Sequence, residues 1–128
     1  MKILLIEDEL PAARRLRKIL DRLLENLGEW GRVPAEIEWI GDPDLALAAA
    51  DKGIDLILLD LNLGGFNSLD WLRASRLPAD RVIIISADTR YCDEAFALGV
   101  FAYVFKPIDE EQLRKHLERF VKTRNLIA

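Results

Sequence analysis

Five short hydrophobic runs alternate along the chain with longer segments whose hydrophobic residues recur at helical spacing. The runs are Ile3–Ile6, Ile37–Ile40, Ile54–Leu59, Val82–Ile85 and Phe101–Phe105. Several of them are continuously apolar, which is typical of strands that are buried on both faces. Strands that alternate with helices are joined by right-handed crossovers, so the pattern predicts a parallel sheet with helices on both sides.

The helical segments carry clear start and stop signals. Pro11 suits a first helical turn, and leucine and isoleucine residues then recur at helical spacing up to Gly28. Asp42, followed by a proline, can cap a second helix. Asp109 can cap the last helix, where Gln112 completes a capping box.

This order of elements predicts an α/β fold: a doubly wound, five-stranded parallel sheet, (βα)₅, in a three-layer α/β/α arrangement. We expect residues 1–128 to form a single domain, with Trp39 and Trp71 in or beside its core. Folds of this class bind ligands beyond the carboxyl ends of their strands. The functional residues should therefore stand directly after the strands.

Composition narrows the class of protein further. The chain has 128 residues, of which 51% are hydrophobic and 31% charged, with a formal net charge of −4 and one cysteine. We expect a soluble cytoplasmic domain without a signal peptide or membrane span. The negative charge gives no general attraction to nucleic acid or to anionic membranes.

Polar residues stand at the carboxyl ends of four predicted strands. They are Glu7 and Asp8 after the first, Asp60 after the third, Ser86 after the fourth and Lys106 after the fifth. Crowded carboxylates favour a cation, and Mg²⁺ prefers oxygen ligands. An aspartate can also act as a nucleophile that yields an acyl phosphate. The set predicts a Mg²⁺-dependent phosphoryl-transfer site in which lysine and hydroxyl groups contact phosphoryl oxygens.

A single aspartate after a strand is most often only a helix cap or a turn residue. Capping, however, requires neither an acid pair after the first strand nor a lysine before a proline after the fifth. The combination is therefore better explained by a site.

Five segments carry a family resemblance. They are Lys2–Glu9, Asp55–Leu61, Ile85–Ala87, Ala95–Val100 and Tyr103–Pro107. In this order they resemble the receiver domains of two-component response regulators along essentially the whole chain. The resemblance implies a flavodoxin-like, CheY-like fold and a phosphoprotein of phosphorelay signal transduction.

The resemblance implies the following roles at the predicted site. Asp60 matches the phosphoacceptor, which receives a phosphoryl group from a histidine kinase, a phosphotransfer protein or a small phosphodonor. Asp8 matches the acid that binds Mg²⁺ directly, and Glu7 its partner that acts through water. Asn62 would lend its backbone carbonyl to the metal, for which Mn²⁺ can substitute.

Three further positions match catalytic and switch residues. Lys106 and Ser86 match the lysine and the hydroxyl that contact the phosphoryl group, and Tyr103 matches the switch aromatic. Phosphorylation is expected to draw in the loop after Ser86 and to rotate Tyr103 inward. This would alter the face formed by the fourth helix, fifth strand and fifth helix, which an effector or a second copy in a homodimer would read. The peptide before Pro107 is expected to be cis.

The sequence departs from the family pattern at several places. Glu7 replaces a commoner aspartate, Gly64 a usual proline and Ser68 a usual glycine, so the loop after the acceptor is expected to be more mobile. The first helix and the following loop, Glu29–Pro34, are longer than typical, and the role of this loop and of Trp30 is not assigned. None of these changes removes a required chemical group.

Two residues bear on the lifetime of the phosphorylated state. Asn62 and Asp88 lie two residues beyond the acceptor and the switch hydroxyl, where they can approach or orient a hydrolytic water. The same combination resembles fast-resetting chemotaxis-type receivers. We therefore expect a short-lived phosphoaspartate.

Three alternatives remain at this point. A phosphohydrolase of the haloacid-dehalogenase type carries its nucleophile in an Asp-x-Asp pattern after the first strand, which Glu7–Glu9 lacks. A dinucleotide-binding domain would have a glycine-rich turn there. A pseudo-receiver would have lost the acceptor or its partners. We expect no enzyme activity beyond self-catalysed phosphorylation and dephosphorylation.

The output is open. The segment Lys106–Glu110 resembles receivers joined to LytTR-type DNA-binding domains. The chain is expected either to act alone through protein contacts or to be part of a longer regulator, and in neither case to bind nucleic acid itself.

Overall fold

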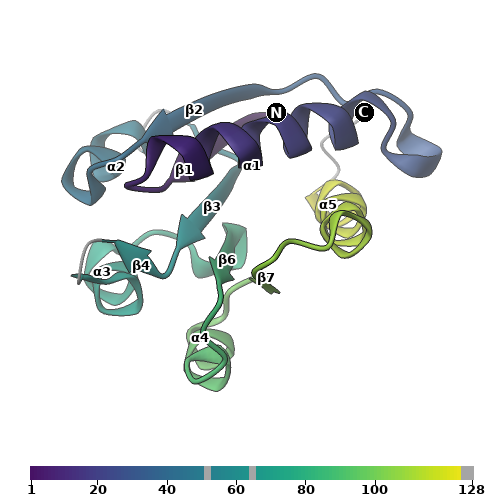
Figure 1. Ribbon diagram of the computed structural model, residues 1–128. Helices are drawn as coiled ribbons and strands as arrows, with labels where there is room; N and C mark the ends of the chain where they lie inside the picture. Colours follow the sequence, from purple (N-terminus) through teal and green to yellow (C-terminus); the bar gives the residue numbers. More distant parts are fainter. Residues whose placement is uncertain (51–52, 64–65, 125–128) are drawn as a thin grey trace.

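A central parallel sheet organises the molecule. The computed structural model describes residues 1–50, 53–63 and 66–124. Its five strands lie in the order β2-β1-β3-β6-β7, all parallel (Figure 1). Their bounds are β1 Lys2–Ile6, β2 Glu36–Ile40, β3 Leu56–Asp60, β6 Val82–Ser86 and β7 Ala102–Phe105. The predicted doubly wound fold is confirmed.

Helices cover both faces of the sheet. They are α1 Leu10–Glu25, α2 Pro43–Ala50, α3 Ser68–Ser75, α4 Cys92–Leu98 and α5 Glu110–Arg124. Successive strand residues face opposite sides: Leu56 and Leu58 pack in a cluster with α1 and α5, whereas Ile57 and Leu59 pack with α2, α3 and α4. The continuously apolar runs are thus explained, because each strand contributes to two hydrophobic clusters.

Several local predictions are confirmed. Asp42 Oδ1 accepts a hydrogen bond from the Asp44 N–H (2.9 Å), and Asp109 Oδ1 accepts from two N–H groups in the first turn of α5. Proline stands in the first turn of α1. The Lys106–Pro107 peptide is cis.

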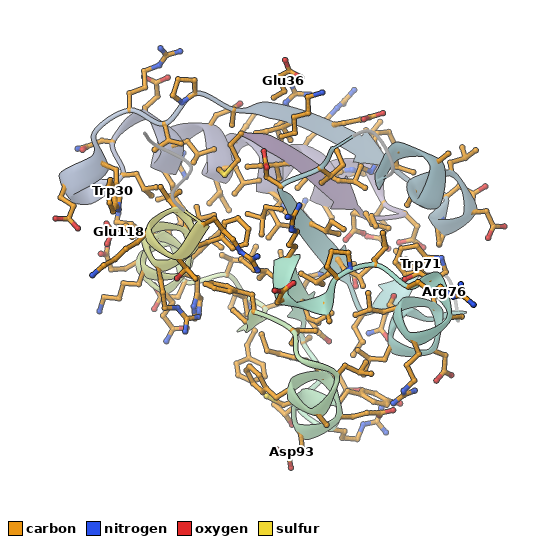
Figure 2. The ribbon with its side chains drawn as sticks, turned by 180° about the vertical axis from the view of Figure 1, so that it is seen from behind. Trp30, Glu36, Trp71, Arg76, Asp93 and Glu118 are labelled. Carbon is orange, nitrogen blue, oxygen red and sulfur yellow. The ribbon has the colours of Figure 1, made fainter. Side chains whose placement is uncertain are left out.

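The predicted end of the first helix was wrong. The helix ends at Glu25, and a 3₁₀ turn, η1 (Gly28–Trp30), follows. Gly28 has a φ of +56°, which turns the chain back, so Leu27 still reaches the core and is fully buried. Trp30 packs half-buried against the cluster beneath α1 and α5, on the same side of the molecule as Glu118 (Figure 2).

Other differences from the prediction lie on the edge strand β2 and in the connections between elements. Trp71 is buried as expected, but Trp39 is 38% exposed because it lies on the edge strand β2. An antiparallel pair, β4 Asn62–Leu63 and β5 Phe66–Asn67, follows β3 and was not predicted. A second 3₁₀ turn, η2, spans Ala79–Arg81. Gly64 lies outside the described residues.

No helix in the described ranges has both the length and the apolar character needed to cross a membrane.

Candidate functional site

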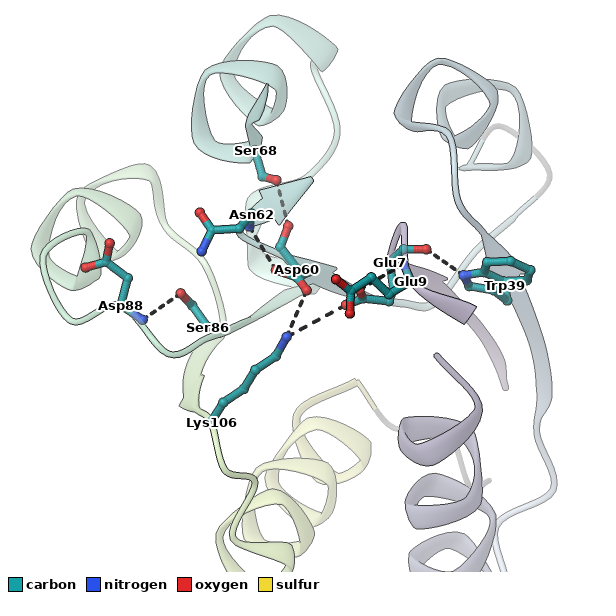
Figure 3. Close-up of polar contacts among 9 residues, drawn as sticks. All are labelled: Glu7, Glu9, Trp39, Asp60, Asn62, Ser68, Ser86, Asp88 and Lys106. Atoms are coloured by element: carbon teal, nitrogen blue, oxygen red, sulfur yellow. Dashed lines mark hydrogen bonds and ion pairs between the residues drawn. The ribbon is translucent and has the colours of Figure 1, made fainter. Parts of the chain in front are cut away.

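The carboxyl ends of the central strands surround an open depression of about 160 Å³. It is lined by Glu7, Asp8, Glu9, Asp60, Asn62, Ala87 and Lys106. Figure 3 shows five of these side chains, those of Glu7, Glu9, Asp60, Asn62 and Lys106. The structure thus brings together five of the seven residues predicted from the sequence. The other two, Ser86 and Tyr103, do not line the depression.

Asp60 lies at the base of the site. It is the last residue of the hydrophobic strand β3, at the carboxyl end of the sheet, and is only 6% exposed. Its Oδ2 lies 2.9 Å from Lys106 Nζ, and its Oδ1 accepts a hydrogen bond of 2.8 Å from the Asn62 N–H. Both oxygens are therefore held in place, one by a charge and one by the backbone.

Glu7 shares the same ammonium group. Its Oε2 lies 3.9 Å from Lys106 Nζ, and its Oε1 accepts a hydrogen bond of 3.1 Å from the Glu9 N–H. Burial, followed by the adjacent Asp60 carboxylate, raises the pKa of Glu7 to about 8, although Glu9 N–H and Lys106 oppose this shift. The interior of the site therefore holds more carboxylate than Lys106 can neutralise.

The donor groups suit a hard cation. Glu7, Asp8 and Asp60 offer carboxylate oxygens, and Asp8 and Asn62 are exposed on the rim. Within the described residues, no group of three or more His, Cys, Asp or Glu side chains is already arranged to hold a metal ion. An open, oxygen-only site with few protein ligands fits Mg²⁺, which keeps several of its waters. The predicted ligand set stays a prediction.

The loop after β6 contains the predicted switch residues. Ser86 Oγ accepts a hydrogen bond of 2.9 Å from the Asp88 N–H, and Tyr103 donates its hydroxyl hydrogen to the Asp88 carbonyl. Tyr103 is only 6% exposed, and burial raises its pKa. The inward rotation of Tyr103 on phosphorylation stays a prediction, but the ring does not start from an exposed position in this structure. The ring already packs in the cluster beside α4 and is held there by its hydroxyl.

Three contacts at the site were missed from the sequence. The Trp39 indole N–H donates to the Glu7 carbonyl at 2.6 Å, and the Ser68 hydroxyl donates to the Asp60 carbonyl, also at 2.6 Å. Arg90 pairs with the Asp88 carboxylate at 2.6 Å and lowers its pKa. Of these contacts, only the one made by Ser68 had a sign in the sequence, because Ser68 replaces a glycine that is usual in the family. Its hydroxyl ties the start of α3 to the acceptor strand.

A second hollow adjoins the site. It has a volume of about 560 Å³ and lies between α1 and the turn from β7 to α5. Its lining is mainly apolar and consists of Ala12, Arg15, Leu16, Ile19, Ala87, Lys106, Pro107 and Ile108. Lys106 and Ala87 belong to both hollows, so the groove opens directly onto the depression.

Comparison with known proteins gives a consistent result. The family model of the response regulator receiver domain matches residues 3–118. The chemotaxis protein CheY of Pseudomonas aeruginosa is 30% identical, over 98% of this chain and 99% of that protein. The response regulatory domain of the protein MrkE from Klebsiella pneumoniae, at 23% identity, has the same fold, with a TM-score of 0.77 over 96% of this chain and 97% of that chain.

Longer proteins also match. The sensory transduction protein LytT of Bacillus cereus is 26% identical over 95% of this chain, which spans only 48% of LytT. The chain thus spans about half the length of this relative and nearly the full length of CheY.

Proposed function

The chain belongs to the response regulator receiver domain family, and we therefore propose that Asp60 is its phosphoacceptor and Mg²⁺ its cofactor. One observation carries the assignment. Asp60 is the only buried aspartate among the described residues, and it stands at the carboxyl end of the central strand β3. Lys106 Nζ lies 2.9 Å from its Oδ2. We also propose that residues 1–128 act as a single receiver unit.

In phosphoryl transfer, an Asp60 carboxylate oxygen forms a bond to phosphorus. The bond from phosphorus to the donor breaks, and its electron pair leaves with the donor, either the imidazole of a phosphohistidine or the carboxylate of an acyl phosphate. The Asn62 N–H and Lys106 hold the carboxylate in one orientation, which reduces the entropy cost of the reaction.

Negative charge on the phosphoryl oxygens must be offset in the transition state. Lys106 supplies one positive charge. The Ser86 hydroxyl, which accepts a hydrogen bond from the Asp88 N–H, can donate its hydrogen to a phosphoryl oxygen once the side chain turns toward it. Asp8, Asp60 and the Asn62 carbonyl would hold Mg²⁺ directly, and Glu7 would do so through water. The ion would supply further positive charge. These ligands are proposed from the family pattern and from the oxygen donors that line the depression.

Dephosphorylation requires a water molecule to attack phosphorus and displace the Asp60 carboxylate. Asn62 lies on the rim of the depression, where such a water would enter. Asp88 is paired with Arg90 in the loop after β6. We propose that Asn62 and Asp88 together set the lifetime of the phosphoaspartate. The ion pair with Arg90 restricts how far the Asp88 carboxylate can orient a water molecule.

The phosphodonor is proposed to be a histidine kinase or a phosphotransfer protein. The mainly apolar groove beside α1 gives such a partner a surface that opens onto Asp60. The effector is proposed to respond to the α4–β7–α5 face, and it can be a separate protein or a further part of a longer regulator.

The direct test is covalent labelling. We expect acetyl phosphate with Mg²⁺ to add one phosphoryl group to the wild-type chain, detected as one increment in intact mass. Asp60→Asn should not be labelled, whereas Asp21→Asn, at an exposed position of α1, should be labelled like wild type. Equal labelling of Asp60→Asn and wild type would refute the assignment.

A further inference from the structure

Two hydrogen bonds from the edge strand β2 hold the backbone of Glu7. The Glu7 N–H donates to the Ile40 carbonyl at 3.2 Å, which continues the ladder between β1 and β2 by one residue. The Glu7 carbonyl lies beyond that ladder, because the chain leaves β2 at Gly41. The Trp39 indole N–H donates to it instead, at 2.6 Å (Figure 3).

This contact fixes the peptide unit between Glu7 and Asp8. The Glu7 carbonyl and the Asp8 N–H belong to one planar group, so a bond to the carbonyl sets the plane from which Asp8 projects. Asp8 is exposed, and within the described residues no hydrogen bond or ion pair of its carboxylate is found. Its direction therefore depends on its backbone.

Packing of the core does not account for the tryptophan. Trp39 is 38% exposed, and its neighbours Glu36 and Glu38 on β2 are exposed as well. The indole lies over Gly41, where an added Cβ atom would be 3.4 Å from the ring and 3.6 Å from the Glu7 carbonyl oxygen. The indole ring and the Glu7 carbonyl thus lie next to each other beside Gly41.

We propose that Trp39 is a positioning residue that orients the Glu7–Asp8 peptide for divalent metal binding. The inference rests on the proposed function, because it takes Asp8 as the direct ligand. A hydrogen bond of this kind corresponds to roughly a two- to tenfold change in affinity.

The variant Trp39→Phe keeps an aromatic ring and removes the N–H. In a Mg²⁺ titration followed by the amide signals of Asp8 and Asn62, we expect the half-saturating concentration to rise roughly two- to tenfold. At saturating Mg²⁺ the rate of labelling by acetyl phosphate should return to within about twofold of wild type, since Trp39 touches no reacting atom. In wild type, the Trp39 indole N–H signal should shift on addition of Mg²⁺.

Trp30→Phe is the matched control, because Trp30 is half-buried away from the site. An unchanged half-saturation in Trp39→Phe, an equal change in Trp30→Phe, or a loss of rate that saturating Mg²⁺ does not restore would each overturn the inference. If wild type binds Mg²⁺ but is not labelled, the proposed function fails while the titration still decides the role of Trp39. A wild-type chain without any Mg²⁺ response overturns both.

Discussion

Glu7 and Asp60 are two buried carboxylates that share one lysine. Lys106 lies 2.9 Å from Asp60 but 3.9 Å from Glu7, so most of its charge acts on the acceptor. Burial, followed by the adjacent Asp60 carboxylate, raises the pKa of Glu7 to about 8 and so favours its protonated form in the absence of metal. Protonation relieves the repulsion between the two groups, and a bound cation would do the same.

The raised pKa of Glu7 makes the stability of the metal-free domain depend on pH. The folded state binds this proton more tightly than the unfolded state, in which the pKa of Glu7 is 4.5. The resulting contribution to the unfolding free energy is therefore fully present below about pH 4.5 and is lost as pH rises through about 8. Glu7→Gln cannot ionise. We expect it to gain ~1–3 kcal/mol in unfolding free energy relative to wild type between pH 5 and pH 9. Urea denaturation in the presence of EDTA would measure this.

Glu29→Gln, an exposed change in the 3₁₀ turn η1, is the control for that experiment. It should follow the wild-type curve at every pH. Parallel curves for Glu7→Gln and wild type would contradict the assigned pKa.

Among the secondary-structure elements, those with buried repetitive patterns were predictable from the sequence. The strands β1, β3 and β6 each carry a continuous apolar run. Asp60 and Ser86 end β3 and β6, and Glu7 directly follows β1. The end of α1 was not predictable, because Leu27 continues the helical spacing even though the chain turns back at Gly28. The Trp39 contact was missed for another reason: the hydrogen bond joins neighbouring strands and follows from no local pattern.

The loop between β6 and α4 connects the site to the α4–β7–α5 face. Its Asp88 is bonded both to Ser86 and to Tyr103, so a turn of the Ser86 hydroxyl toward a phosphoryl group would release one end of that chain of contacts. Because Tyr103 already lies inside, we expect the response to begin in the loop, before any movement of the aromatic ring.

Beryllofluoride with Mg²⁺ tests this order of events. We expect wild-type amide signals to shift across Ala87–Arg90, α4 and β7. Ser86→Ala should still bind the phosphoryl analogue but shift these signals less, because it lacks the hydroxyl that transmits the change. Ser75→Ala, which removes a hydroxyl at the end of α3, is the control and should respond like wild type. Shifts confined to the loops around Asp60 would show that this connection is absent.

At the scale of the whole molecule, the two hydrophobic clusters support the site from opposite faces of one sheet. The cluster beneath α1 and α5 contains Leu20 and Phe120, both fully buried. Stability in domains of this size is a small difference between large terms, so one large cavity can remove much of it.

Substitutions at two leucines of α1 test how strongly the stability of the domain depends on a filled core. Leu20 is fully buried, whereas Leu10 is 39% exposed. We expect Leu20→Ala to lower the unfolding free energy by ~2–5 kcal/mol, through lost burial and the cavity left behind. Leu10→Ala should cost less than ~1 kcal/mol. Equal losses in urea denaturation would show that α1 does not pack as described.

The alternation of strand residues between the two clusters limits where the chain can change length. Inserting one residue within β3 would exchange the faces of every side chain that follows in the strand. Inserting two residues would preserve the faces but move Asp60 by about 6.6 Å along the strand, beyond the reach of its 2.9 Å contact with Lys106. We therefore expect sequence insertions and deletions among relatives of this chain to fall in the connections, such as residues 26–35 between α1 and β2, and not within the strands.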